Sequence, residues 1–325
     1  MNKSNDYMPI NLSTIRVDTA VGCDLYLENR IHGTIQYVLY CSRLSTIRLS
    51  KIEELQKHNV KKLFIRKGEL KAYLLYAESN LKSIIRDDKV DVQVKTEMVY
   101  DVAKSIMIDI FGQPCSREQL LRSKVWITNV IDFAMMHEDV FSNIVNLISY
   151  DYTTYSHSVN VSIYGLLFAK YVGFERDGLP AFTTGLLLHD IGKTQIEPEI
   201  VNKKSRLNKE EFARIKMHVE LGAEMIIQAD CFESTCLLPV LQHHEKCNGT
   251  GYPKGLFEDS IHKYGKMATI IDVYDALTTR RPYSDARKPF AALTLMTDEM
   301  KGSFDMDLLK HFILFLGTGG IKQTF

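Results

Sequence analysis

The chain has 325 residues, of which 45% are hydrophobic and 25% charged, a composition typical of a folded globular protein rather than a disordered one. Forty basic residues balance forty acidic ones, whereas proteins that bind nucleic-acid polymers are usually basic. No apolar stretch is long enough to span a membrane, the N-terminus has no apolar signal core, and the six cysteines form no Cys-x-x-Cys pair. We therefore expect a cytoplasmic protein with reduced thiols, and the length suggests two domains.

The first 68 residues predict a small α+β domain. Segments 35–40 and 62–65 are rich in aromatic and β-branched residues, as strands are. Between them, segment 49–58 has the spacing of a short helix. The domain carries no catalytic constellation, so we expect a regulatory or interaction role.

Residues 69–114 predict a helical linker with a break at 86–89, ended by Gly112-Gln113-Pro114. From residue 115 to 325 nearly everything is helical in pattern, which favours an all-α bundle. The predicted fold class is thus α+β overall, with the small N-terminal domain followed by that bundle. The main helices expected in it are 116–149 with a break near 137–138, 179–190, 208–229 capped by Asn208, 266–279, and one capped by Asp305 that ends near 316.

Several histidines of the bundle lie beside aspartates or near other histidines. Taken singly, each would more often be a core or surface histidine, and a His-His pair alone is a weak signal. Together, five histidines and two aspartates suffice for two metals that share a bridging carboxylate, because such sites gather imidazole and carboxylate ligands from several rigid elements. These residues are His157, His189, Asp190, His218, His243, His244 and Asp272.

Residues 150–325 resemble the HD-GYP family, a subgroup of the HD-domain metal-dependent phosphohydrolases. The resemblance rests on motifs that occur in the family's order. They are Asp151 to Ser158, Leu188-His189-Asp190-Ile191-Gly192-Lys193, His218, His243-His244-Glu245, Gly249-Thr250-Gly251-Tyr252-Pro253, Ile271 to Leu277, and Arg281-Pro282-Tyr283.

The resemblance implies an HD-type bundle and a cyclic-di-GMP phosphodiesterase that hydrolyses 3′–5′ phosphodiester linkages to pGpG, GMP or both. It implies a metal-activated water at a binuclear site, with two divalent or mixed-valent ions per chain, iron or manganese. The seven residues above are the ligands it implies, and Asp190 is the implied bridge.

The resemblance also implies substrate contacts. Lys193 follows Asp190 by three residues, and its ammonium could stabilise charge on the phosphate. Further contacts are expected from Gly251, Tyr252, Pro253 and Arg281.

Two positions depart from the family pattern. Thr153 stands where some members carry a glutamate that recruits a third metal, so two metals are expected. Ser284 replaces a basic residue that many relatives have, which could lower substrate affinity or change substrate choice.

Two alternatives to a cyclic-di-GMP phosphodiesterase stay open. One is a receptor that binds the dinucleotide or a partner protein with little turnover, and the other is a hydrolase of another cyclic dinucleotide or a mononucleotide. The complete ligand set and Lys193 favour hydrolysis, and the Gly-Tyr-Pro loop weighs against a mononucleotidase. Protein partners could bind through that loop or the N-terminal domain, and a homodimer is also possible.

Overall fold

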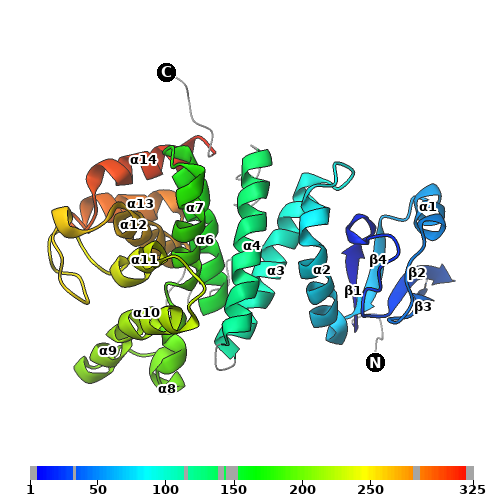
Figure 1. Cartoon of the computed structure of the whole chain (residues 1–325), viewed down its shortest axis with the longest axis horizontal. Coiled ribbons are helices and arrows are strands. Elements are labelled where there is room, and N and C mark those ends of the chain that lie inside the picture. Colours follow the sequence, from blue (N-terminus) through cyan, green and yellow to red (C-terminus); the bar gives the residue numbers. More distant parts are fainter. Residues whose placement is uncertain are drawn as a thin grey trace. The chain divides into compact units, whose positions relative to one another are not determined.

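The computed structural model describes residues 6–31, 34–112, 116–137, 143, 153–280 and 286–319. The chain divides into two compact units, Met1–Ser105 and Ile106–Phe325. The first contains a small sheet and the second is helical, so the predicted α+β class is confirmed (Figure 1). The helices expected to form a linker over 69–114 fall mainly in the first unit, and the division at 68 and 114 remains a prediction.

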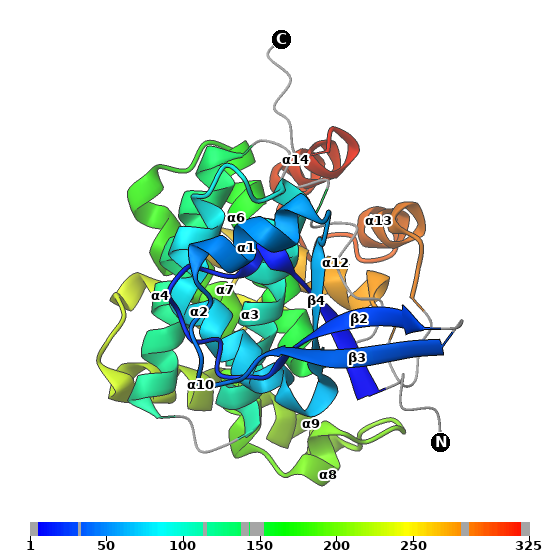
Figure 2. The same ribbon diagram turned by 90° about the vertical axis from the view of Figure 1, so that its right-hand side faces the viewer.

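The sheet of the first unit is antiparallel, with strand order β1-β4-β2-β3. Strands β2 and β3 form a hairpin (Figure 2). In β4, Leu63 and Ile65 alternate with more exposed residues and are fully buried, as expected for a strand with one face on a core. Both predicted strands and the predicted helix are confirmed. The elements are β1 (Tyr7–Asn11), β2 (Leu25–Ile31), β3 (Thr34–Cys41), α1 (Leu49–Lys57) and β4 (Lys62–Arg66).

Two helices follow the sheet, α2 (Leu70–Ile85) and α3 (Val92–Gly112), so the predicted break between them is confirmed. Helix α2 holds the chain that follows β1 through two tyrosine hydroxyls. The hydroxyl of Tyr73 lies 2.7 Å from Thr14 Oγ1, and that of Tyr76 accepts the backbone N–H of Arg16 at 2.7 Å. These buried polar contacts tie helix and sheet into one unit.

The second unit is a bundle of helices. Helices α6 and α7 are buried on nearly all sides and pack together, which explains why both are apolar around most of their circumference (Figure 1). The helices are α4 (Arg117–Met136), α6 (Thr154–Tyr171), α7 (Leu179–Leu188), α8 (Pro198–Val201), α9 (Lys209–Lys216), α10 (His218–Ala229), α11 (Leu237–Gln242), α12 (Lys263–Thr278), α13 (Pro289–Asp298) and α14 (Met306–Gly317).

The predicted caps at Asn208 and Asp305 are confirmed, but one predicted helix end is wrong and one predicted helix is interrupted. Helix α7 ends at Leu188, and the next residues enter a 3-10 turn, Ile191–Gln195. The expected helix 208–229 is interrupted at Met217, where the His218 ring donates to the Ile215 carbonyl at 2.7 Å. Helices α8, α11 and α13 were not among the predicted helices. Within the described residues, no helix has the length and apolarity needed to cross a membrane.

Candidate metal centre

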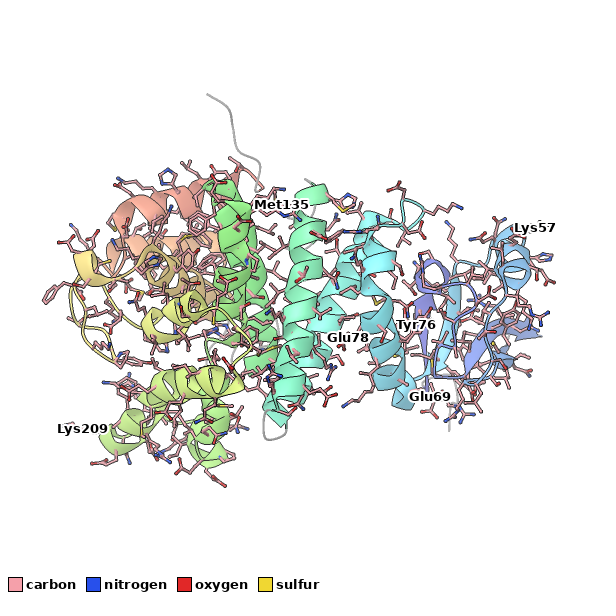
Figure 3. The ribbon with its side chains drawn as sticks, viewed as in Figure 1. Lys57, Glu69, Tyr76, Glu78, Met135 and Lys209 are labelled. Carbon is pink, nitrogen blue, oxygen red and sulfur yellow. The ribbon has the colours of Figure 1, made fainter. Side chains whose placement is uncertain are left out.

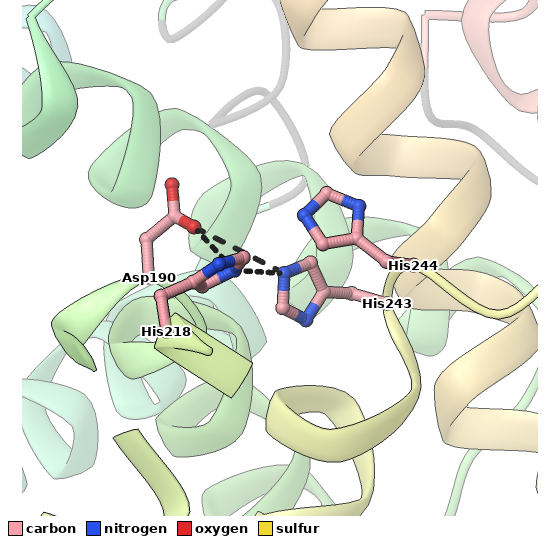
Figure 4. A group of neighbouring side chains, drawn as sticks. All are labelled: Asp190, His218, His243 and His244. Carbon is pink, nitrogen blue, oxygen red and sulfur yellow. Dashed lines mark hydrogen bonds and ion pairs between the residues drawn. The ribbon is translucent and has the colours of Figure 1, made fainter. Parts of the chain in front are cut away.

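The seven residues expected as ligands converge from five helices or helix ends. They form two groups, and within each group the potential ligand atoms all lie within 4.8 Å of one another. The first group combines the end of α7 with α10 and α11 (Figure 4), and the second combines α6, the end of α7 and α12. The first group is Asp190, His218, His243 and His244, and the second group is His157, His189 and Asp272.

The carboxylate of Asp190 lies between the two groups. Its Oδ1 is 3.3 Å from His218 Nε2 and 3.9 Å from His243 Nε2. Its Oδ2 is 3.5 Å from His189 Nε2 and 4.0 Å from His157 Nε2. Each oxygen therefore faces a different group, which is the arrangement that a carboxylate needs to bridge two cations.

Asp272 connects the groups a second time. Its Oδ1 lies 3.0 Å from His157 Nε2, and its Oδ2 lies 3.9 Å from His244 Nδ1. The two groups are thus parts of one cluster with two carboxylates at its centre.

Four imidazole rings are oriented by hydrogen bonds from Nδ1. His189, His218 and His243 have Nδ1 next to backbone carbonyls of their own helical segments, at 2.7, 2.7 and 2.9 Å. His157 Nδ1 lies 2.7 Å from the buried carboxylate of Asp275. Because these oxygens accept hydrogen bonds, the network assigns the proton to Nδ1 and leaves a lone pair on each Nε2.

With the protons on Nδ1, the lone pairs of the Nε2 atoms face one another or a carboxylate, and a cation between them would satisfy them. Nε2 of His218 faces Nε2 of His243 at 3.2 Å, and Nε2 of His157 faces Asp272 Oδ1 at 3.0 Å. His189 Nε2 and Asp190 Oδ1 are buried without any hydrogen-bond partner. A buried unsatisfied polar atom costs about 1–3 kcal/mol, so the cluster fits metal ions, which would satisfy all of these atoms together.

The histidines are also in the protonation state that ligation needs. Burial lowers the pKa of His218 and of His243 to about 4, and it lowers the pKa of His189 as well. Burial by itself raises the pKa of Asp190, but Lys193 and the adjacent imidazoles outweigh it and hold that pKa well below the usual range. At neutral pH these three histidines are therefore neutral and Asp190 is ionised, the forms that bind metals.

A glycine lets the turn that follows Asp190 approach α10. A Cβ atom at Gly192 would lie 2.0 Å from the carbonyl oxygen of His218 and 2.5 Å from the backbone nitrogen of Gly222. No larger residue fits there without moving the backbone. The Gly192 of the His-Asp motif thus brings Asp190 and His218 together.

The glycine-rich loop after His244 is fixed by Glu245. This buried carboxylate accepts the backbone N–H groups of Lys254 at 2.7 Å and Leu256 at 2.8 Å. At Gly251 a Cβ atom would lie within 2.6 Å of three backbone atoms of residues 244–246, so the loop folds tightly over the end of α11. As a result the Tyr252 ring packs on His244, with centroids 4.5 Å apart.

Two other predicted residues have defined positions at the site. Lys193 Nζ lies 2.5 Å from Asp190 Oδ2, where it balances the charge of the carboxylate. The Thr153 hydroxyl accepts the N–H of Ser156 and caps α6, so it is used for helix capping. Arg281 and Ser284 lie outside the described residues.

Sequence reasoning gave no role to Glu245 or to Asp275. Asp275 is fully buried on α12, and its Oδ1 also accepts a hydrogen bond from Asn160 Nδ2 at 3.0 Å. Its spacing of three residues from Asp272 puts both carboxylates on one face of a helix, and this spacing was the available signal.

We expect Asp275→Asn to weaken metal binding about 10–100-fold, because residues that orient an imidazole ligand typically contribute that much. The amide cannot provide the negative charge that now polarises His157. The measurement is a titration of metal-stripped protein with Mn²⁺, with bound metal quantified directly. Asp307→Asn, which neutralises an exposed carboxylate on α14, is the control, and equal affinity in both variants would refute the orienting role.

Comparison with known proteins identifies similar chains. A family model described as an HD domain matches residues 168–308. The "Cyclic di-GMP phosphodiesterase PA4108" of Pseudomonas aeruginosa is 33% identical over 185 residues, 56% of this chain and 44% of that protein. The "3'3'-cGAMP-specific phosphodiesterase 3" of Vibrio cholerae is 30% identical over 152 residues, 47% of this chain and 33% of that protein. The chain therefore spans less than half the length of these curated relatives.

In fold, the chain is similar to Bd1817, an HDG"Y"P protein from Bdellovibrio bacteriovorus. The TM-score is 0.64 at 22% identity, over 96% of this chain and all of that chain. The segment that matches the HD-domain model lies within the helical unit. The chain also carries the His-Asp pair, the paired histidines and the Gly-Tyr-Pro loop on which its resemblance to the HD-GYP family rests.

Proposed function

We propose that the protein is a metal-dependent phosphodiesterase that hydrolyses the 3′–5′ linkages of cyclic-di-GMP to pGpG, GMP or both. The observation that carries the proposal is the bridging position of Asp190, whose two oxygens face two separate groups of ligand-type atoms. Relatives named as cyclic-di-GMP phosphodiesterases support this substrate.

The residues would act in three ways. The first and second groups would each hold one metal ion, and a bound pair supplies Lewis-acid activation of water and neutralises phosphate charge. Asp190 would bridge the pair, while Asp275 and the backbone carbonyls keep the imidazoles aimed at the centre. Lys193 would hold the phosphate by its ammonium, and Tyr252 would line the entrance next to His244.

The number of ions is proposed to be two. Thr153 is engaged in capping α6, and a neutral hydroxyl is a poor substitute for a carboxylate ligand. Iron or manganese is the expected identity. Homodimerisation, protein partners at the Gly-Tyr-Pro loop or the N-terminal domain, a cytoplasmic location and a substrate contact at Arg281 also remain predictions from sequence.

We expect metal-stripped protein to be inactive and protein reloaded with Mn²⁺, or with Fe²⁺ without oxygen, to convert cyclic-di-GMP to pGpG or GMP. Chromatography of the products, with 3′3′-cGAMP as a parallel substrate, is the measurement. Binding of cyclic-di-GMP without any product under all metal conditions would favour a receptor. Hydrolysis of 3′3′-cGAMP alone would assign the chain to a different cyclic dinucleotide.

A further inference from the structure

Lys216, the last residue of α9, is held by two aromatic rings. Its Nζ lies 4.7 Å from the ring centroid of Phe212 and 5.2 Å from that of Tyr252. The rings themselves are 6.2 Å apart in an edge-to-face arrangement. Both can attract the ammonium through their negatively polarised faces, so its position is set before any ligand binds. We refer to Phe212, Lys216 and Tyr252 as the Lys216 cluster.

The Lys216 cluster adjoins the candidate metal centre from two directions. Tyr252 packs on the ring of His244, and Lys216 is followed two residues later by His218, the first residue of α10. His244 is also the most exposed of the histidines in the two groups, with 26% of its side chain accessible, whereas the other four are buried. The cluster therefore adjoins the most accessible histidine of the centre.

Among the described residues, Lys216 has no anionic partner, in contrast to three cations near it. Arg214 pairs with Glu197, Lys203 with Glu211, and Lys193 with Asp190. For Lys216, the described part of the chain provides contacts to aromatic rings and no carboxylate within ion-pair distance. Phe212 is 45% exposed, while Lys216 and Tyr252 are half-buried, so the cluster lies at the surface with its charge partly accessible.

We propose that the Lys216 cluster is a subsite for the phosphate of the cyclic dinucleotide that is not being cleaved. The inference rests on the proposed function. A cyclic dinucleotide carries two phosphodiester groups, each with one negative charge, and only one can lie at the metal centre during a hydrolytic step. The chain has no net charge, so the second phosphate needs a local cation.

The chemistry of Lys216 suits this task. An ammonium offers three donors and no acceptor, and its hydrogen bonds to phosphate oxygens are strengthened by charge. The two rings occupy part of its surface and restrict the side chain, which lowers the entropy lost when a phosphate binds. The cluster would thus distinguish a cyclic dinucleotide from a phosphodiester that has a single phosphate.

The test compares Lys216→Met with Lys209→Met in the metal-loaded protein. Both variants remove one positive charge from α9, but Lys209 is exposed at the opposite end of that helix (Figure 3). The substrates are cyclic-di-GMP and bis(p-nitrophenyl) phosphate, which has one phosphate only. We expect Lys216→Met to raise the KM for cyclic-di-GMP about tenfold with kcat within about twofold of wild type, because one charge-assisted contact is lost. Its KM for bis(p-nitrophenyl) phosphate, and both constants of Lys209→Met, should not change.

Phe212→Leu provides a second variant, since it keeps an apolar side chain and removes one ring from Lys216. It should raise the KM for cyclic-di-GMP by a smaller factor than Lys216→Met.

An unchanged KM in Lys216→Met, or an equal rise for both substrates, would overturn the subsite. Loss of bound metal in Lys216→Met would overturn it too, because Lys216 would then act on the centre. If wild-type protein cleaves bis(p-nitrophenyl) phosphate but not cyclic-di-GMP, the proposed substrate fails and the subsite with it. A rise in the KM of Lys216→Met for cyclic-di-GMP alone supports both the proposed substrate and the subsite.

Discussion

Asp190→Ala is expected to lose at least one metal ion per chain and to fall below about 1% of the wild-type rate with cyclic-di-GMP, since even removal of a residue that only orients a ligand costs about 10–100-fold. The expectation follows from the geometry, because Oδ1 and Oδ2 of this one carboxylate face different groups of ligand atoms. Without the bridge, two cations would repel each other with no shared anion between them.

Elemental analysis of metal-reloaded protein is the direct measurement, with about two ions per chain expected for wild type. Asp190→Asn is the matched variant, because it keeps the size of the side chain and removes its charge. Thermal unfolding in a chelator separates a loss of metal from a loss of fold. Retention of both ions in Asp190→Asn with a normal rate would show that the charge of this residue is not what joins the two groups.

The candidate ligands could be named from the sequence, but their arrangement could not. A His-Asp pair at the end of an apolar helix and a His-His pair before a glycine-rich loop are visible in the chain. Hydrophobic periodicity gives the helices that carry them, yet it contains no information on which helix ends meet. The close approach at Gly192, which brings Asp190 next to His218, depends on backbone packing between the turn after α7 and α10.

The same limit explains the residues that were missed. Asp275 contacts His157, which is 118 positions away in the chain. Nothing in the sequence distinguishes Lys216 from other lysines, because its contact with Tyr252 depends on how the glycine-rich loop folds. In the first unit, β2 was missed because Glu28, Asn29 and Arg30 lower its strand propensity. The segment is a strand because it pairs with β3 in a hairpin, in spite of this low propensity. Local pattern therefore located most of the long helices but not all of their ends, and it was insufficient for contacts between elements.

Lys193→Ala is expected to lower kcat about 100–1000-fold while leaving the metal content unchanged, the loss typical of one electrostatic contact to the reacting group. In the structure the Lys193 ammonium lies 2.5 Å from Asp190 Oδ2, one of the two atoms proposed to bind metal. A cation at that oxygen competes with a metal for the same lone pairs. Removal of Lys193 therefore cannot weaken metal binding through this contact, and the loss of activity must come from the phosphate.

Lys193→Arg is the control that keeps the positive charge and changes its shape, and it should retain more activity than Lys193→Ala. Bound metal is measured on the same samples that give kcat, so the two effects are separated without a change of conditions. Metal lost from Lys193→Ala as completely as from Asp190→Ala would mean that the ammonium supports the cluster itself. In that case the contact between Lys193 and Asp190 would be structural, and a different group would have to stabilise the charge that develops on the phosphate.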